Sequence, residues 1–189
     1  MKKTIIFLAE GFEEIEALSV VDILRRANVE CKMCSLGHTA VTGSHGIQVM
    51  ADITLENADI DEFDCLILPG GMPGAKHLKE NSKIIEYVKK FHRENKLIAA
   101  ICAAPIVLAE AKVIENLEIT SFPGVKDQLK GAIYKEELVV QNKNFITSRG
   151  PATAIEFGFA IVKALDKKEE ENLREAMLVN FLEKKIKEK

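Results

Sequence analysis

The sequence predicts an α/β fold in which a mostly parallel sheet carries helices on both faces. Apolar runs of strand length, rich in β-branched residues, alternate along the chain with segments of helical spacing. Such runs are typical of parallel strands that are buried on both faces. The 189 residues suffice for one domain with a real core. Because no Gly/Ser linker or fixed repeat divides them, we expect a single domain over residues 1–189.

The N-terminal part opens with a buried strand over residues 4–9, an uninterrupted apolar run. A helix is expected over 13–27, where apolar residues recur three and four positions apart. The next apolar run predicts a strand at 29–36. Residues 40–50, with the turn Gly-Ser-His-Gly at 43–46, predict a small hairpin excursion from the main fold.

A short buried strand over 64–68 ends at a Pro-Gly-Gly turn, and an amphipathic helix is expected over 82–94. A further buried strand at 96–101 runs directly into a helix over 104–111. The same patterns predict later elements. These are strands at 117–121, 138–141 and 144–147 and helices at 150–165 and 168–187.

The last expected helix has an apolar stripe. Leu173, Met177 and Phe181 recur four positions apart, and charged residues fill most other positions. This stripe needs a partner surface, within the domain or across a dimer, so we expect a structural role for the helix. Three further apolar residues lie beside the stripe: Leu178, Leu182 and Ile186.

Composition excludes several classes of protein. The net charge of −3, the absence of tryptophan and the presence of only two tyrosines argue against nucleic-acid binding. The longest apolar run, 97–109, is broken by Pro105 and is shorter than the ~20 residues of a membrane span. The N-terminus lacks the apolar core of a signal peptide. We therefore expect a cytoplasmic protein, not a membrane protein, with reduced cysteines.

In a parallel sheet, ligands bind at the carboxyl ends of the strands, which selects the loops 10–13, 69–74 and 102–105. In the last of these, a hydrophobic strand delivers Cys102 into a helix start among small residues, the layout of a nucleophile elbow. Unpaired N–H groups and the helix dipole would stabilise a thiolate there. The alternative is a buried structural cysteine, since free cysteines often have that role.

The Pro-Gly-Gly loop allows close approach of its backbone to a ligand. The N–H groups of Gly71 and Ala103 could then form an oxyanion pocket, although a simple tight turn explains the loop equally well. Glu13 and Glu14 are expected to favour the helix dipole. Glu16 shares a stripe with apolar residues, so it is expected to be partly buried, with the raised pKa of a proton donor, unless it is a surface acid.

Arg149, at a strand-to-helix junction, could bind an anionic group or pair with a carboxylate, or lie on the surface. Cys31 and Cys34 look like a redox pair, but a strand points them to opposite faces, so we interpret them as structural. Cys65 is expected to be inert within its strand. The four histidines show no zinc-ligand spacing, and we propose no metal site. They are His38, His45, His77 and His92.

Five motifs in order resemble the ThiJ/PfpI superfamily, in the branch of the Parkinsonism-associated deglycase and the YajL-like bacterial proteins. The resemblance extends from the first strand to about residue 165. The motifs are GFEEIE at 11–16, LPGG at 68–71, AAICAAP at 99–105, FPGVKD at 122–127 and TSRGP at 147–151.

The resemblance implies a flavodoxin-like three-layer sandwich with Cys102 on the elbow and Glu16 hydrogen-bonded to its sulfur. It also implies an oxyanion pocket from Gly71 and Ala103, no cofactor, and a homodimer in which His45 approaches the partner's active site. Some members have a histidine where this chain has Phe122, which removes the usual second acid or base.

The resemblance favours a cysteine enzyme of the protein deglycase or glyoxalase III type, acting on methylglyoxal, glyoxal or their adducts. The alternative is an oxidative-stress sensor or redox-regulated chaperone that works by oxidation of Cys102 without turnover. A peptidase is disfavoured because Ala103, not histidine, follows the cysteine. A glutamine amidotransferase is disfavoured because no His-Pro-Glu occurs.

Overall fold

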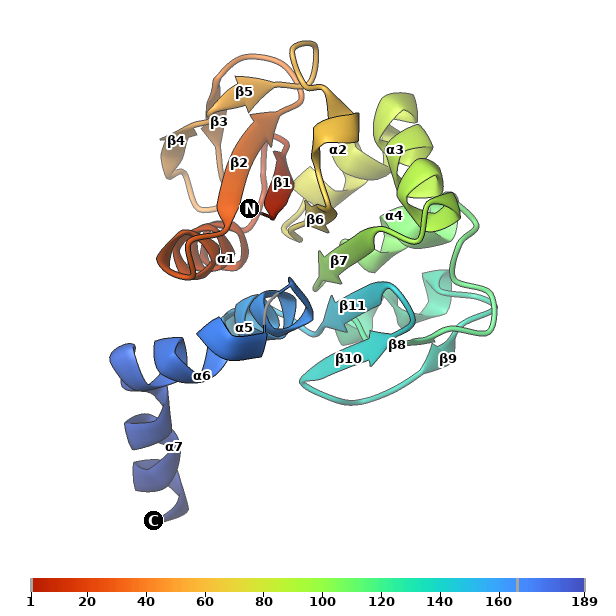
Figure 1. The fold of residues 1–189 in the computed structure, drawn as a ribbon. Coiled ribbons are helices and arrows are strands. Elements are labelled where there is room, and N and C mark those ends of the chain that lie inside the picture. Colours follow the sequence, from red (N-terminus) through yellow and green to blue (C-terminus); the bar gives the residue numbers. More distant parts are fainter. Residues whose placement is uncertain (1, 166, 189) are drawn as a thin grey trace.

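A seven-stranded sheet forms the centre of the computed structural model, which describes residues 2–165 and 167–188. The strand order is β10-β11-β7-β6-β1-β2-β5, and all neighbours are parallel except the β10–β11 pair (Figure 1). The strands are β1 (Lys3–Leu8), β2 (Glu30–Ser35), β5 (Ile53–Thr54), β6 (Cys65–Leu68), β7 (Leu97–Ile101), β10 (Val139–Asn142) and β11 (Phe145–Ser148).

Helices cover both faces of the sheet, which confirms the predicted three-layer α/β sandwich (Figure 1). One apolar core joins the sheet to α2, α3 and α4, and a second joins it to α1 and α5. The helices are α1 (Glu14–Arg26), α2 (Gly74–Glu80), α3 (Ser82–Arg93), α4 (Pro105–Glu110), α5 (Ala154–Leu165), α6 (Lys167–Ala176) and α7 (Val179–Lys187). Short 3-10 helices occur at η1 (Ile60–Glu62), η2 (Pro123–Gln128) and η3 (Pro151–Thr153).

Two small sheets lie beside the main one. The hairpin of β3 (Ala40–Thr42) and β4 (Gln48–Met50) confirms the predicted excursion. The predicted strand at 117–121 is reduced to β8 (Glu118–Ile119). It pairs with β9 (Ile133–Tyr134), not with the main sheet. The edge of the main sheet beyond β11 is occupied by β10, so β8 lies outside that sheet.

The expectation of one C-terminal helix over 168–187 is wrong. The helix breaks at Leu178, whose φ of 60° lies in the left-handed region, and α6 and α7 continue on either side. Leu173 and Val179 are buried against the second core, whereas Phe181 remains 59% exposed. The break lets Val179 reach that core and separates the predicted apolar stripe into a covered and an uncovered part. Figure 1 shows α6 and α7 extending away from the sheet.

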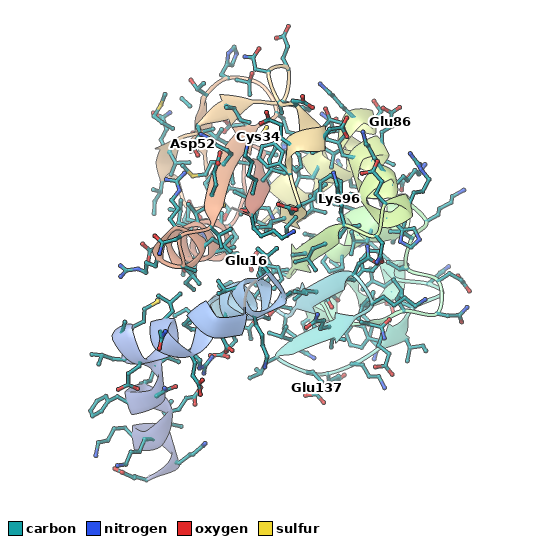
Figure 2. The ribbon with its side chains drawn as sticks, viewed as in Figure 1. Glu16, Cys34, Asp52, Glu86, Lys96 and Glu137 are labelled. Atoms are coloured by element: carbon teal, nitrogen blue, oxygen red, sulfur yellow. The ribbon has the colours of Figure 1, made fainter. Side chains whose placement is uncertain are left out.

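The pair Cys31 and Cys34 lies on β2 as predicted, with the two side chains in different cores. Figure 2 labels Cys34 on this strand. Burial raises the pKa of Cys31 to about 11 and that of Cys34 to about 12. Burial also raises the pKa of Cys65 well above its usual range. All three thiols are buried, so reagents in solution do not reach them. Among the described residues, no helix is long and apolar enough to cross a membrane.

Candidate active site

The three loops that the sequence predicted to bind a ligand converge at Gly70, the second residue after the end of β6. A Cβ atom at Gly70 would lie 2.6 Å from Glu16 Oε2, 2.7 Å from Cys102 Cβ and 3.0 Å from the backbone nitrogen of Ala103. Real Cβ contacts are longer than this, so a larger residue cannot replace Gly70 without displacing the site. The glycine therefore permits α1, the β6 loop and the β7 loop to meet.

Cys102 occupies the elbow between β7 and α4 with a φ of 62°, a left-handed conformation that non-glycine residues rarely adopt. Such strain costs about 1–3 kcal/mol and persists only where the surroundings impose it. Here the Cys102 N–H donates to the Ser148 carbonyl at 3.0 Å, and the Cys102 carbonyl accepts from the Phe122 N–H at 2.8 Å. The predicted nucleophile elbow is thus present, and the cysteine is half-buried rather than sealed in the core.

Glu16 is fully buried, although the sequence predicted only partial burial. It lies on α1 in the interior of the molecule, where Figure 2 labels it. The carboxyl accepts the Gly70 N–H at 2.8 Å through Oε2 and shares a hydrogen bond with the Cys102 thiol. Burial raises its pKa to about 7, against the lowering effect of these hydrogen bonds, and the negative charge of Glu13 adds to the rise. A carboxyl with this pKa can give and accept a proton at neutral pH.

The pKa of Cys102 is raised to about 12, not lowered as the elbow alone suggests. Burial is the main cause, followed by the negative charge and hydrogen bonding of Glu16, while the N–H groups of Ala103 and Gly71 lower it. The charge effect of Glu16 reverses when its carboxyl is protonated, because a neutral carboxyl can donate to the sulfur. The two groups therefore titrate as one pair, in which the thiolate exists when the proton is on Glu16.

Gly71 and Ala103 lie as predicted, with their backbone N–H groups directed at the Cys102 sulfur. Gly71 has a φ of +83°, and a Cβ there would lie 2.3 Å from the Glu13 nitrogen, so only glycine fits. Two N–H groups beside a nucleophile can hold a negative oxygen that forms on the attacked carbon. The structure thus brings four predicted residues together: Cys102, Glu16, Gly71 and Ala103.

A cavity of about 710 Å³ opens beside Cys102. Its wall includes the apolar side chains of Met72, Ile106 and Phe122. The acidic residue Glu13 also lines it. Sequence reasoning missed this apolar wall. Phe122 had been considered only as the place of an absent histidine. Since its contribution is a surface rather than a chemical group, no motif marks it.

His45 is exposed on the β3–β4 hairpin and does not line this cavity. Its Nδ1 lies 3.0 Å from Glu14 Oε2, and its backbone N–H donates to Glu14 Oε1 at 2.8 Å. The interpretation of Glu14 as an acid that merely favours the helix dipole is therefore incomplete, because Glu14 is buried and anchors the hairpin. A role of His45 at a partner's site remains a prediction.

The ligand atoms of Glu13, Glu14 and His45 lie within 4.8 Å of one another, a spacing that could hold a cation. The Glu14 oxygens, however, already accept the N–H groups of His45 and Ile47. These hydrogen bonds account for the cluster without a metal. Burial acts to raise the pKa of Glu14, but the hydrogen bonds it accepts outweigh burial and hold the pKa at about 2.

Arg149 is half-buried at the end of β11. It does not line the cavity, and it forms no ion pair with another residue of the part that the structure describes. The structure therefore does not join Arg149 to the other predicted site residues. Its contact with an anionic group remains a prediction.

A strained cysteine on a strand-to-helix elbow, paired with a buried glutamate at the carboxyl edge of a parallel sheet, defines a class of α/β proteins with a cysteine-centred site. The family model described as DJ-1/PfpI family matches residues 2–164. The chain belongs to the DJ-1/PfpI family.

Individual relatives agree with this assignment. The chain is 37% identical over 184 residues to the protein dj-1beta of Drosophila melanogaster, covering 95% of this chain and 98% of that protein. The crystal structure of Drosophila melanogaster DJ-1beta superposes with a TM-score of 0.91 over 94% of this chain and 97% of that one, at 37% identity. A protein named deglycase from Pyrococcus abyssi is 33% identical over 165 residues, covering 86% of this chain and 99% of the relative.

Proposed function

We propose that this protein is a cofactor-free enzyme that converts 2-oxoaldehydes such as methylglyoxal to 2-hydroxy acids, or releases them from their adducts. The observation that carries the proposal is the hydrogen-bonded pairing of the Cys102 thiol with the buried carboxyl of Glu16. Cys102 supplies the nucleophile. Glu16, whose pKa is raised to about 7 mainly by burial, can act as acid and base next to it.

In the first step, the Cys102 thiolate attacks the aldehyde carbon. A C–S bond forms, and the carbonyl π electrons move to the oxygen, which the N–H groups of Gly71 and Ala103 hold. Protonated Glu16 gives its proton to this oxygen. The product is a neutral hemithioacetal on Cys102, and Glu16 becomes a carboxylate.

In the second step, the Glu16 carboxylate removes the hydrogen of the former aldehyde carbon as a proton, and an enediolate forms with its negative charge on the neighbouring oxygen. Glu16 returns this proton to the neighbouring carbon, and the hydroxyl proton of the hemithioacetal passes to the neighbouring oxygen, which leaves a 2-hydroxy thioester on Cys102. Water attacks the thioester carbon, the C–S bond breaks, and the 2-hydroxy acid leaves. One carbon is oxidised while its neighbour is reduced, so the reaction consumes only water.

An adduct of the aldehyde with an amine would enter the same route: the C–S bond forms, the C–N bond breaks, and protonated Glu16 gives its proton to the nitrogen of the departing amine. This is the deglycase version of the reaction. The relative from Pyrococcus abyssi that carries the name deglycase supports this version. Both versions use the same residues, and both need Cys102 as the nucleophile.

The test is steady-state lactate production from methylglyoxal by the wild-type protein and by Cys102→Ser. We expect many equivalents of lactate per chain from the wild type and a loss of at least about a hundredfold in the variant. Lactate limited to one equivalent, or equal rates for both proteins, would refute the proposal.

The second candidate function is an oxidation sensor. One observation favours it: Cys102 is half-buried, whereas the other three thiols are buried. A solved relative described as Toxoplasma gondii DJ-1, oxidized, is 32% identical, with a TM-score of 0.90. Limiting peroxide should modify Cys102 before the other thiols. A sensor would accumulate this product without turnover of methylglyoxal, so the two functions separate in the lactate assay.

A further inference from the structure

The cavity beside Cys102 is much larger than a three-carbon dicarbonyl requires. At ~30 Å³ per water in the liquid, its 710 Å³ equals the space of roughly two dozen waters. Methylglyoxal has only a handful of non-hydrogen atoms and would leave most of this space to solvent. Cavities of this volume are typical of sites that enclose larger ligands. The volume therefore points to a substituent larger than methyl.

The wall next to Cys102 is apolar. Ile106 and Val125 form part of it from one side, and Met72 and Pro151 contribute from neighbouring loops. Met72 is 56% exposed, which leaves a large apolar surface in contact with water at the entrance of the cavity. A ligand that covers this surface gains the free energy of apolar burial, which grows with the area covered.

Phe122 completes the wall at the mouth, where its side chain is 49% exposed. Its backbone N–H donates to the Cys102 carbonyl at 2.8 Å, which holds the backbone of Phe122 next to the nucleophile. The ring lies beside two glycines. A Cβ at Gly124 would be 3.2 Å from the ring atom Cε1, and a Cβ at Gly150 would be 3.9 Å from Cδ2. The ring therefore lies close to Gly124, where a side chain would crowd it, and within van der Waals distance of a side chain at Gly150.

The charged residues of the rim already have partners of opposite sign. Lys76 Nζ lies 3.7 Å from Glu80 Oε1, and Lys79 Nζ lies 3.9 Å from Glu110 Oε2. The rim therefore offers no concentrated charge to an ionic substituent. With Glu13 also in the wall, an anionic substituent would meet repulsion rather than attraction.

We propose that the cavity binds the side chain of the substrate, and that this protein prefers 2-oxoaldehydes with an uncharged aryl or branched-alkyl substituent over methylglyoxal. Phe122 is the specificity-determining residue, because its ring faces the substituent while the carbonyl carbons lie at Cys102. The inference rests on the proposed function for the identity of the reacting group, but the apolar cavity itself stands on the geometry.

The experiment compares kcat/KM for methylglyoxal, isobutylglyoxal and phenylglyoxal, each divided by the rate of that aldehyde with free N-acetylcysteine to remove differences in carbonyl reactivity. Added apolar groups that fill a pocket are worth about tenfold or more each in selectivity. We therefore expect at least a tenfold preference for the two larger aldehydes. A glyoxal with a carboxylate on its side chain should show no such gain.

Phe122→Asn should remove most of the preference for the two larger aldehydes, because the apolar ring no longer contacts their substituents. The matched control is Phe181→Asn on α7, a phenylalanine that is 59% exposed and does not line the cavity. The control should keep the full preference. An equal loss in both variants would overturn the role of Phe122.

Protection of Cys102 from iodoacetamide gives a second readout that needs no turnover. Mandelate carries the phenyl group of the expected product and lactate carries the methyl group, so mandelate should protect at concentrations at least about tenfold lower. If methylglyoxal is turned over without any preference for larger aldehydes, the inference is wrong and the proposed function stands. If no aldehyde is turned over but mandelate still protects better, the proposed function is wrong and the apolar specificity of the cavity stands. Equal protection by both acids would overturn the inference.

Discussion

Replacing Glu16 by glutamine should speed the alkylation of Cys102 and slow the turnover of methylglyoxal. The side chain keeps its size and its contact with the Gly70 N–H, but it loses the negative charge and the titratable proton. The charge and hydrogen bonding of Glu16 are the second and third causes of the raised pKa of Cys102, after burial. Their removal should lower the pKa of the thiol, so alkylation should become faster while proton transfer is lost.

The size of the change follows from the raised pKa. The pKa of Cys102 rises from 9.0 to about 12, mainly because of burial, so thiolate at neutral pH is up to about a thousandfold scarcer than for a free thiol. Burial remains in the variant, so only part of this factor can be recovered. We expect alkylation at about pH 8 to accelerate by roughly tenfold. Turnover of methylglyoxal should fall by about two orders of magnitude or more, the usual contribution of a general acid–base residue.

The assay is iodoacetamide labelling of Cys102 followed by mass spectrometry between about pH 6 and pH 9, beside steady-state lactate formation. The difference in labelling should widen as the pH rises through 7, because wild-type Glu16 then becomes charged. Asp22→Asn is the control, since Asp22 lies on the exposed face of the same helix in an ion pair with Arg26. Slower labelling of Glu16→Gln, or turnover equal to wild type, would refute the shared-proton pair.

Three further predictions concern stability and assembly. The pKa of Glu14 is held at about 2, so its carboxylate stabilises the fold at pH values above the ordinary pKa of 4.5. This contribution, at most about 3 kcal/mol, is lost as the pH falls from about 4.5 to 2. Urea unfolding of Glu14→Gln should show a lower midpoint and a flatter pH dependence in that window; an unchanged midpoint would contradict the anchoring role. Leu173→Ala should cost about 2 kcal/mol or more, whereas the exposed Leu182→Ala should be near neutral; truncation after Asp166 should lower the melting temperature and spare Cys102 labelling. Light scattering should give a homodimer of about 42 kDa, twice the 21.0 kDa of one chain, and a concentration-independent monomer would refute it.

Alternating strands and helices were predictable because each buried strand reads as a continuous apolar run. The segments that sequence reasoning missed are short or weakly patterned. Helix α2 (Gly74–Glu80) starts within a glycine-rich turn, and β5 (Ile53–Thr54) is two residues long. The break at Leu178 lacks any glycine or proline signal, because it depends on the burial of Val179 against the second core.

The sequence predicted the site residues that carry a reactive group. Cys102 was found at the end of a buried strand, and Glu16 was found from the apolar stripe that it shares on the helix after the first strand. The rise in the pKa of Cys102 could not be predicted, because it depends in part on the full burial of Glu16. The apolar stripe of a helix does not reveal full burial. The roles of Gly70 and Phe122 were likewise hidden, because both act through shape: one by leaving space and the other by filling it.

The most direct test of the account is the pH dependence of kcat/KM for lactate formation from methylglyoxal. Below the pKa of Glu16, which burial raises to about 7, both members of the pair are protonated and neither a thiolate nor a base is present. The account predicts that kcat/KM rises through an apparent pKa near 7 in the wild type, and that this inflection is absent from the residual activity of Glu16→Gln. A flat profile from about pH 6 to pH 8, or the same inflection in both proteins, would contradict it.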